Sequence, residues 1–177
     1  LESMATRNQS AVMLVRFLGV EEYVLEAYRD GTLNHPFNDV PTWASPHVAY
    51  LYKMGLTKGI SAKEYGGKTI VTGNQYATMI LRLLGYDDGK ADFNWTTAFQ
   101  FMTNTYSVDI SSYVLTDIST IEISRGQMVS MSYMSLYFDY KYVNYQVIDY
   151  LYFNEVITSE NYEAFKVQQN SNTNVLY

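Results

Sequence analysis

The sequence predicts an all-α fold in which one helical unit recurs along the chain. Gln75–Gly85 reads QYATMILRLLG and Gln9–Gly19 reads QSAVMLVRFLG, so Gln, Ala, Met, Arg, Leu and Gly match at equal spacing. A weaker third copy, ISRGQMVSMSYMSLY, spans Ile123–Tyr137. Apolar residues recur at three- and four-residue intervals, which is typical of an amphipathic helix. Because such units cannot bury their apolar faces alone, we expect them to pack on one another within a single domain.

Residues 37–85 contain one complete unit of two helices and a connecting loop. Apolar residues at helical spacing predict a first helix over Pro46–Met54. Gly55 ends this helix, since glycine takes the left-handed position after a helix at no steric cost. After a polar, glycine-rich loop, Thr72 caps the second helix and Gln75 completes a capping box. The expected order is therefore helix, loop and capped helix.

The other two copies carry the same signal for the start of a helix. Thr6 stands at the position of Thr72, and Ser124 caps the third copy with Gln127 as its capping-box partner. Each copy is therefore expected to begin its second helix in the same way.

The first copy begins without a preceding first helix, and the C-terminal part of the chain contains a candidate for it. Tyr150-Leu151-Tyr152 repeats Tyr50-Leu51-Tyr52. We therefore predict that a helix near Tyr145–Asn154 supplies the missing helix of the first unit and packs near Gln9–Leu18. This helix would close a three-part ring.

The remaining segments are expected to connect the units. A helix or helical turn is predicted between Val20 and Pro36, and a further helix from Trp95 to Met102. Ser107–Glu122 is rich in Ser, Thr and β-branched residues and is expected to be a loop with a short extended piece. The tail from Gln168 is polar without a period, so we expect it to be frayed or a linker.

Composition excludes several classes of function. The chain has 177 residues, enough for one compact domain with a core. Its formal net charge of −6 argues against nucleic acid or an anionic membrane surface as a partner, because both need clustered Lys and Arg. The absence of cysteine excludes a disulfide framework, a metal–thiolate site and a catalytic cysteine. No run approaches the ~20 apolar residues that a membrane span needs.

The spacing of several short motifs resembles the S-layer homology (SLH) domain. That family's pattern is F-x-D-V-P, W-A, a helix, G-[LI]-x-x-G, then [IV]-T-R-x-[EQ] and a helix ending in L-G. Residues 37–85 carry FNDVP, WA, GLTKG, VTGNQ and LLG in this order. The outer copies contribute ATRNQ at Ala5–Gln9 and ISRGQ at Ile123–Gln127, so the resemblance covers about Met4–Tyr137.

The resemblance implies three SLH-like units in a pseudo-threefold arrangement around a central helical bundle. We expect a single domain over residues 1–167, followed by a polar tail over 168–177. Its units would span about 4–36, 37–86 and 87–140, and a C-terminal helix over 143–166 would complete the first unit.

The resemblance also implies binding of a secondary cell-wall polysaccharide, often one bearing pyruvate ketals, in grooves between neighbouring units. The motif arginine, which meets the acidic sugar substituent in that family, falls at Arg7 and Arg125. A guanidinium at a helix start suits a carboxylate, because its bidentate fork is joined by the positive end of the helix dipole and by free backbone N–H groups. The middle unit has Gly73 instead, so its groove is expected to be weak or inactive. The alternative for both arginines is a surface charge near a helix cap.

Three further residues are candidates for the ligand-binding site. Trp43 can stack on a sugar ring, Asp39 can accept hydrogen bonds from hydroxyl groups, and Lys58 in GLTKG can line the edge of a groove. Each has a structural alternative. Trp43 would then be a packing plug between helices, Asp39 would stabilise a turn, and Lys58 would be a solvated side chain.

Nothing in the sequence indicates an enzyme, and we expect no cofactor or metal. His35 and His47 are the only histidines, and no zinc-hydrolase, nucleophile-elbow or phosphate-loop motif occurs. The expected function is non-covalent anchoring of an exported protein at the bacterial cell wall, which places the chain outside the cell. The alternative is a degenerate SLH fold that serves as a structural or protein-binding module without affinity for glycan.

Overall fold

The structure, a computed structural model, describes residues 2–107 and 118–173. In these residues it is helical and contains no β-strand, which confirms the predicted all-α class. The helices are α1 (Arg7–Phe17), α2 (Glu21–Arg29), α3 (Ser45–Lys53), α4 (Gly73–Leu83), α5 (Ala98–Thr105), α6 (Arg125–Ser135), α7 (Val147–Phe153) and α8 (Ser159–Thr173). Two short 3-10 helices, η1 (Asp88–Lys90) and η2 (Trp95–Thr97), precede α5.

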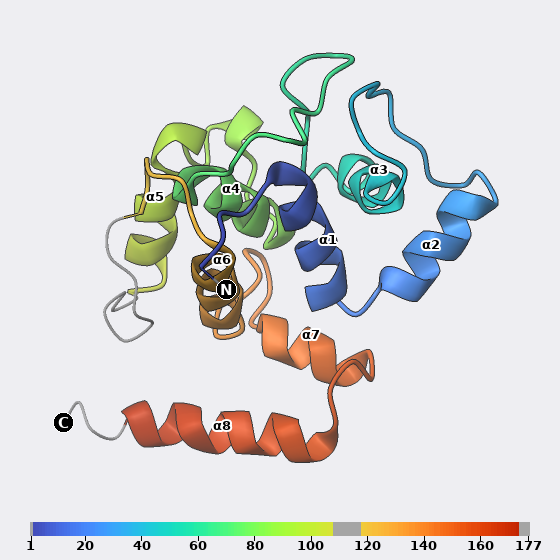
Figure 1. The fold of residues 1–177 in the computed structure, drawn as a ribbon. Helices are drawn as coiled ribbons and strands as arrows, with labels where there is room; N and C mark the ends of the chain where they lie inside the picture. Colours follow the sequence, from blue (N-terminus) through green and yellow to red (C-terminus); the bar gives the residue numbers. More distant parts are fainter. Residues whose placement is uncertain (1, 108–117, 174–177) are drawn as a thin grey trace.

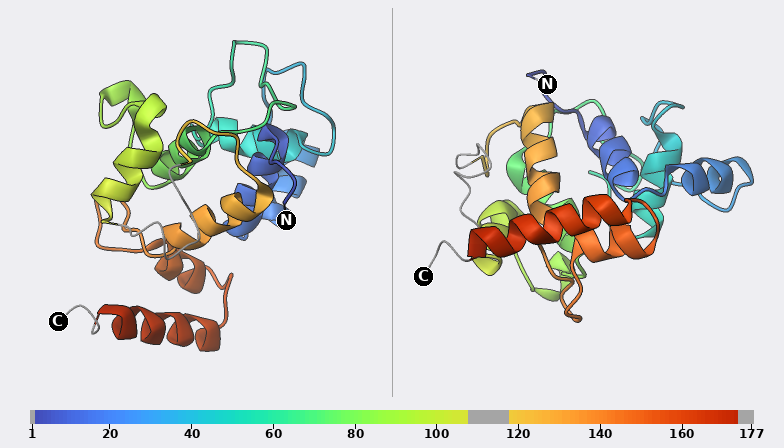
Figure 2. Two further views of the ribbon diagram at one scale, coloured as in Figure 1. Left: turned by 60° about the vertical axis from the view of Figure 1, so that its left-hand side comes forward. Right: turned by 90° about the horizontal axis from the view of Figure 1, so that it is seen from below.

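The three helices that begin with the repeated motif, α1, α4 and α6, lie at the centre of the molecule (Figure 1). The other helices surround them. α3 packs on α1 and carries α2 on its outer side, while α5 packs on α4. α7 follows α6, and α8 runs along the outside beside α7, as the turned views also show (Figure 2).

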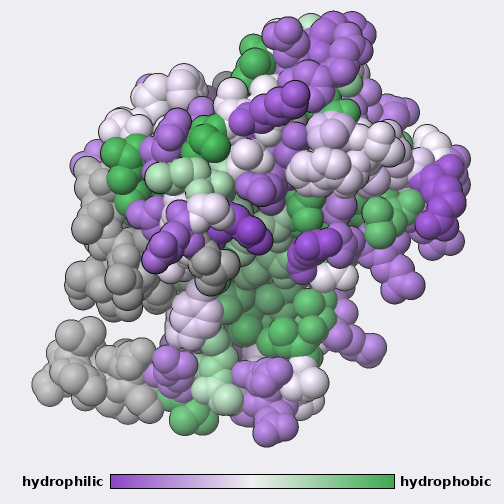
Figure 3. All heavy atoms as spheres, viewed as in Figure 1, coloured by the Kyte–Doolittle hydropathy of each residue, from purple (hydrophilic) through white to green (hydrophobic). Residues whose placement is uncertain are grey.

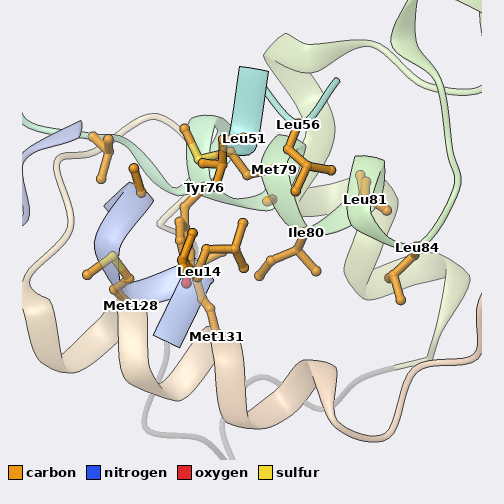
Figure 4. Packing of buried hydrophobic residues seen from close by; sticks show 14 of the residues in the cluster. Leu14, Leu51, Leu56, Tyr76, Met79, Ile80, Leu81, Leu84, Met128 and Met131 are labelled. Carbon is orange, nitrogen blue, oxygen red and sulfur yellow. The ribbon is translucent and has the colours of Figure 1, made fainter. Parts of the chain in front are cut away.

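The core lies where the three central helices meet. Leu14 of α1, Met79 and Ile80 of α4, and Met131 of α6 are buried and pack together (Figure 4). The hydroxyl of Tyr76 on α4 has a partner on α6, since Tyr76 Oη lies 2.7 Å from Ser132 Oγ. Of the methionines at the repeated position, Met79 and Met131 are buried, whereas Met13 of α1 is half-buried.

The three central helices begin at a closed ring of backbone hydrogen bonds. Ala5 N donates to Ile123 O, Ile123 N to Val71 O, and Val71 N to Ala5 O, each at 2.9 Å. All three residues are fully buried, and each directly precedes the N-cap of a central helix.

The expected capping boxes are present in all three copies. Thr6 and Ser124 accept from the backbone N–H three residues further on, as Thr72 does, and the glutamine side chain of each box accepts from the backbone N–H of the N-cap. The repeat in the sequence is therefore a repeat of local helix geometry.

The C-terminal part differs from the prediction in two respects. Instead of one helix over 143–166, two helices occur, α7 and α8, separated by a turn with Glu155 at φ 58°. Residues 168–173, expected to be a frayed tail, continue α8. Phe165 explains the extension, because it is buried and packs against the Tyr137 ring at 4.3 Å, which anchors an otherwise polar helix. Most of the loop expected over 107–122, and the end of the tail, lie outside the described residues.

The turn after α7 repeats the turn after α3 bond for bond. Leu56 N donates to Leu51 O, and Val156 N donates to Leu151 O, both at 2.8 Å. The residue before each donor, Gly55 or Glu155, has a left-handed backbone with φ of 71° or 58°. The match between Tyr50-Leu51-Tyr52 and Tyr150-Leu151-Tyr152 thus extends to the backbone.

Candidate functional site

Two surface grooves contain the motif arginines. The first, which we call the Arg7 groove, has a cavity volume of about 380 Å³. Its lining residues come from the start of α1, the loop after α3, the outer face of α4 and η2. They are Arg7, Lys58, Gly59, Ile60, Gln75, Thr78, Met79, Arg82, Asp88 and Trp95.

The second, which we call the Arg125 groove, has a cavity volume of about 580 Å³. It lies between α1 and the start of α6, with one tryptophan from the turn before α3. Its lining residues are Gln9, Val12, Met13, Arg16, Phe17, Trp43, Arg125 and Met128. On the face of Figure 1, the surface over the lower part of α1 is hydrophobic and hollowed towards α7 (Figure 3).

The two grooves are built from corresponding positions of different units. Each contains the glutamine of the capping box and three further positions of one central helix, at the same spacing from its cap. Each adds one tryptophan and one motif arginine from the neighbouring units. The corresponding pairs are Gln75 and Gln9, Thr78 and Val12, Met79 and Met13, Arg82 and Arg16, Trp95 and Trp43, and Arg7 and Arg125.

Arg7 is held in place by its surroundings. Its Nη2 donates to Thr57 Oγ1 at 3.1 Å, and its guanidinium carbon lies 4.9 Å from the centre of the Tyr65 ring. Tyr65 in turn donates its hydroxyl to the backbone carbonyl of Arg7, and burial raises the pKa of Tyr65 to about 12. The buried Nε of Arg7 has no partner within the described residues. The guanidinium is thus held in place where it lines the groove, with its Nε shielded from solvent.

The expectation that free backbone N–H groups at the helix start assist Arg7 is wrong. Arg7 N donates to Thr69 O, Asn8 N to Gly67 O, and Gln9 N to Thr6 Oγ1. These bonds hold the preceding loop against α1 and leave no donor of the first turn for a ligand at those positions. Binding of a carboxylate would therefore rest on the guanidinium and the helix dipole.

Arg125 is exposed, in contrast to Arg7. Its backbone N–H donates to Ser3 O, but its guanidinium has no hydrogen-bond or ion-pair partner within the part of the chain that the structure describes. All of its side-chain donors are therefore available to a ligand, although the side chain must be ordered when it binds.

The second arginine of the Arg7 groove belongs to a network of charges. Arg82 donates to both carboxylate oxygens of Asp88, at 2.8 and 2.9 Å, and to Leu56 O. Lys58 Nζ lies 3.3 Å from the same carboxylate. The hydrogen bonds from Arg82 lower the pKa of Asp88 to about 2, against the effect of burial. Lys58 therefore lines the groove, next to a carboxylate that partly neutralises it.

The corresponding Arg16 of the Arg125 groove makes a similar pair. Its Nε lies 2.8 and 3.0 Å from the two carboxylate oxygens of Glu21, and the buried His47 lies 2.8 Å from one of them through Nε2. Burial alone would raise the pKa of Glu21, but the contacts with His47 and Arg16 outweigh it and keep the pKa below its ordinary value. Arg16 and Arg82, which occupy the repeated arginine position, thus both form salt bridges at the edge of a groove.

Asp39 holds the loop at Tyr65 and Gly66 in place. Its carboxylate accepts from Tyr65 N at 2.7 Å and from Gly66 N at 2.8 Å, and these hydrogen bonds outweigh burial in lowering the pKa of Asp39. It lines neither groove. Because Tyr65 contacts Arg7, Asp39 can influence the Arg7 groove through the loop that it holds.

Both grooves contain an exposed tryptophan. Trp43 and Trp95 are 57% and 54% exposed, so neither serves as a packing plug between helices. Trp43 lies in the Arg125 groove, whereas Trp95 in the Arg7 groove was not recognised as a site residue. The signal for Trp95 was present as Phe93-Asn94-Trp95, a shortened form of the FNDVPTW turn.

The third corresponding arginine position is filled by backbone. Gly73 N lies within hydrogen-bonding distance of the carbonyl oxygens of both Ile118 and Ile121. A Cβ atom at Gly73 would overlap the carbonyl group of Ile118. This close approach explains why glycine stands where the other two central helices carry arginine.

The described residues contain no group of three or more His, Cys, Asp or Glu side chains that could hold a metal ion. Among them there is also no helix that is long and apolar enough to span a membrane. Comparison with curated proteins and with solved structures gave no match.

Comparison with family models gave a match that falls on the middle unit. This segment supplies Trp43 to the Arg125 groove and Lys58 and Gln75 to the Arg7 groove, so it contributes to both. Domains of the matching family generally anchor proteins at the bacterial cell wall by binding its secondary polymers. Residues 36–77 match the family model of the S-layer homology domain.

Proposed function

We propose that this chain anchors a protein non-covalently to a bacterial cell wall by binding an acidic secondary polysaccharide in the Arg7 and Arg125 grooves. The observation that carries the proposal is the recurrence of the same six positions in both grooves. A protein of net charge −6 places two arginines in each groove and adds Lys58 to the first. Asp88 neutralises one positive charge in the first groove and Glu21 one in the second, so each groove keeps a net positive charge. Both grooves therefore favour an anionic ligand.

The exposed tryptophans support a saccharide. In each groove an indole ring lies at the surface near the arginines, where it can stack on the apolar face of a sugar whose carboxylate meets a guanidinium. A pyruvate ketal, which carries such a carboxylate on a sugar ring, is the substituent that we propose. The location of the protein would then be the outer surface of the cell.

A structural or protein-binding role is the second candidate, and one observation favours it. The arginine position of the middle unit is closed by Ile118, so a site that the other two units possess is lost from the middle one. If the chain had abandoned glycan binding, the remaining arginines would be surface charges and the partner would be a protein.

Co-sedimentation with purified Gram-positive cell walls tests the proposal. Walls are compared before and after chemical removal of the secondary polysaccharide, with the variants Arg7→Ala, Arg125→Ala and the double variant. Each substitution should weaken binding about tenfold to a hundredfold, since a charge-assisted hydrogen bond contributes about 1.5–3 kcal/mol. The double variant should not pellet, because both contacts of the polymer are lost.

Arg29→Ala provides the matched control, because Arg29 is exposed at the end of α2 and lines neither groove. Thermal melting of each variant shows whether the fold is retained. Pelleting that persists without the polysaccharide, or in the double variant, would refute the proposal and direct the search to protein partners.

A further inference from the structure

A third cavity, of about 470 Å³, lies at the other end of α4, next to Leu83 and Leu84. We call it the tyrosine cavity, because five tyrosines line it. They are Tyr50, Tyr140, Tyr142, Tyr145 and Tyr150. Its volume falls within the range of about 300–1,000 Å³ that is usual for small-ligand sites.

Four of the tyrosine hydroxyls are left without a partner. Those of Tyr50 on α3, Tyr150 on α7, and Tyr140 and Tyr145 on the connection from α6 to α7 make no hydrogen bond within the described residues. None of these hydroxyls is sealed from solvent, although all four side chains are half-buried. Burial raises the pKa of Tyr140 to about 12 and raises that of Tyr50 as well, so these groups remain donors at neutral pH.

The rest of the lining carries little charge. Lys141 is the one charged residue that lines the cavity; its ammonium group is paired with Asp92 and also lies 4.9 Å from the centre of the Tyr142 ring. Leu18, Leu83 and Leu84 provide an apolar floor. The cavity thus offers aromatic and aliphatic surface together with several hydroxyl groups, and no free charge.

This chemistry matches an uncharged sugar. A pyranose has an apolar face that packs against a ring and a rim of hydroxyls that exchange hydrogen bonds with tyrosine hydroxyls. An apolar side chain of a protein would fill the same volume but would leave the four hydroxyls unpaired, at a cost in binding.

A further depression shares lining residues with both the cavity and the Arg7 groove. Lys58 and Arg82 line it together with the groove, and Met54 and Gly85 line it together with the cavity. The length of α4, about 16 Å at 1.5 Å per residue, sets the distance that a bound chain would cross. A linear polymer can therefore occupy both ends at once.

We propose that the tyrosine cavity is a subsite for uncharged sugar residues of the same polysaccharide whose acidic group binds in the Arg7 groove. The identity of the polymer rests on the function proposed above, whereas the subsite rests on the tyrosine hydroxyls. The two can be tested separately, because only the first depends on charge.

Isothermal titration with two forms of the isolated wall polysaccharide separates them. One form is native, and in the other the carboxyl groups have been reduced to alcohols. Tyr50→Phe combined with Tyr150→Phe removes two hydroxyls and keeps both rings. Tyr52→Phe is the matched control, since Tyr52 lies on α3 as well but does not line the cavity.

The wild-type protein should bind the neutral polymer more weakly than the native polymer. Arg7→Ala should leave the affinity for the neutral polymer unchanged. The double tyrosine variant should bind it about tenfold more weakly, because each lost hydrogen bond is expected to contribute a factor of about two to ten. The Tyr52→Phe variant should bind like the wild type.

The results distinguish the two proposals. If the native polymer binds through the arginines but the neutral polymer does not bind, the subsite is refuted and the proposed function stands. Binding of the neutral polymer that is unaffected by loss of the hydroxyls would also refute the subsite. If neither polymer binds, both proposals fail.

Discussion

Arg7 and Arg125 occupy corresponding positions but differ in how far they are organised for binding. Arg7 is fixed by Thr57 and by the ring of Tyr65, whereas Arg125 is exposed and unpaired within the described residues. Ordering a long side chain on binding costs about 0.5–1.5 kcal/mol. For an equal number of contacts, the Arg7 groove is therefore expected to bind the acidic sugar more tightly than the Arg125 groove.

At the same scale, Asp88 makes the stability of the Arg7 groove depend on pH. The pKa of Asp88 is about 2 in the folded protein, below its ordinary value of 3.8. Because the unfolded chain then binds more protons at acid pH, the free energy of unfolding rises with pH. This contribution, on the order of 2 kcal/mol, is fully present above about pH 5 and is lost as the pH falls towards 2.

Asp88→Asn should therefore lower the free energy of unfolding by about 2 kcal/mol at pH 7, and the two proteins should converge near pH 2. Urea denaturation at a series of pH values measures the difference. Glu163→Gln, at an exposed position of α8, is the control and should have little effect at either pH. A difference between Asp88→Asn and the wild type that does not change with pH would contradict the role given to this carboxylate.

At the scale of the element, the start of α4 shows how one helix loses a site while keeping its cap. Its capping box is intact, but the backbone of Ile118 occupies the space that a side chain at Gly73 would need. Gly73→Ala should lower the free energy of unfolding by about 1–3 kcal/mol, the usual cost of overpacking against atoms that cannot move freely. Chemical denaturation measures it.

Gly31→Ala is a useful comparison for this variant. A Cβ atom at Gly31 would meet nothing within 4 Å, but its backbone has φ +84°, so the expected cost of about 1–2 kcal/mol comes from the backbone alone. A further substitution, Ile118→Gly, should not rescue Gly73→Ala, since the conflict is with the main-chain carbonyl. If Gly73→Ala does not change the free energy of unfolding, the backbone at Ile118 can move to make room for the Cβ atom, which contradicts the prediction.

The elements also explain what the sequence could predict and what it could not. Helix starts such as Thr72 were predictable, because a capping box is formed by residues three positions apart. The grooves were only partly predictable, since Trp95 and Arg7 are distant in sequence and meet only through packing of the units. The extent of α8 was not predictable, because its sequence is polar and the helix is held in place by the tertiary contact of Phe165 with Tyr137.

At the scale of the whole molecule, the ring formed by Ala5, Val71 and Ile123 joins the three central helices at one end. We propose that this ring marks a pseudo-threefold axis and that α7 completes the first unit, as α3 serves the second. Two observations support this. The turn after α7 repeats that after α3, and Gly19 at the end of α1 lies against the side chain of Val156 in that turn.

Two truncated chains test whether α7 belongs to the domain in this way. Ending the chain at residue 158 removes α8 and should leave a single cooperative melting transition at a somewhat lower temperature. Ending it at residue 143 also removes Val147, Ile148 and Leu151, which are buried. At about 1.5–3 kcal/mol each, these three side chains account for roughly 5–9 kcal/mol, which is comparable with the total stability of a domain of this kind. The shorter chain should therefore lose its cooperative transition in calorimetry.

If it instead melts cooperatively at the temperature of the longer chain, the first unit is complete without α7, and the three-part ring closes in some other way.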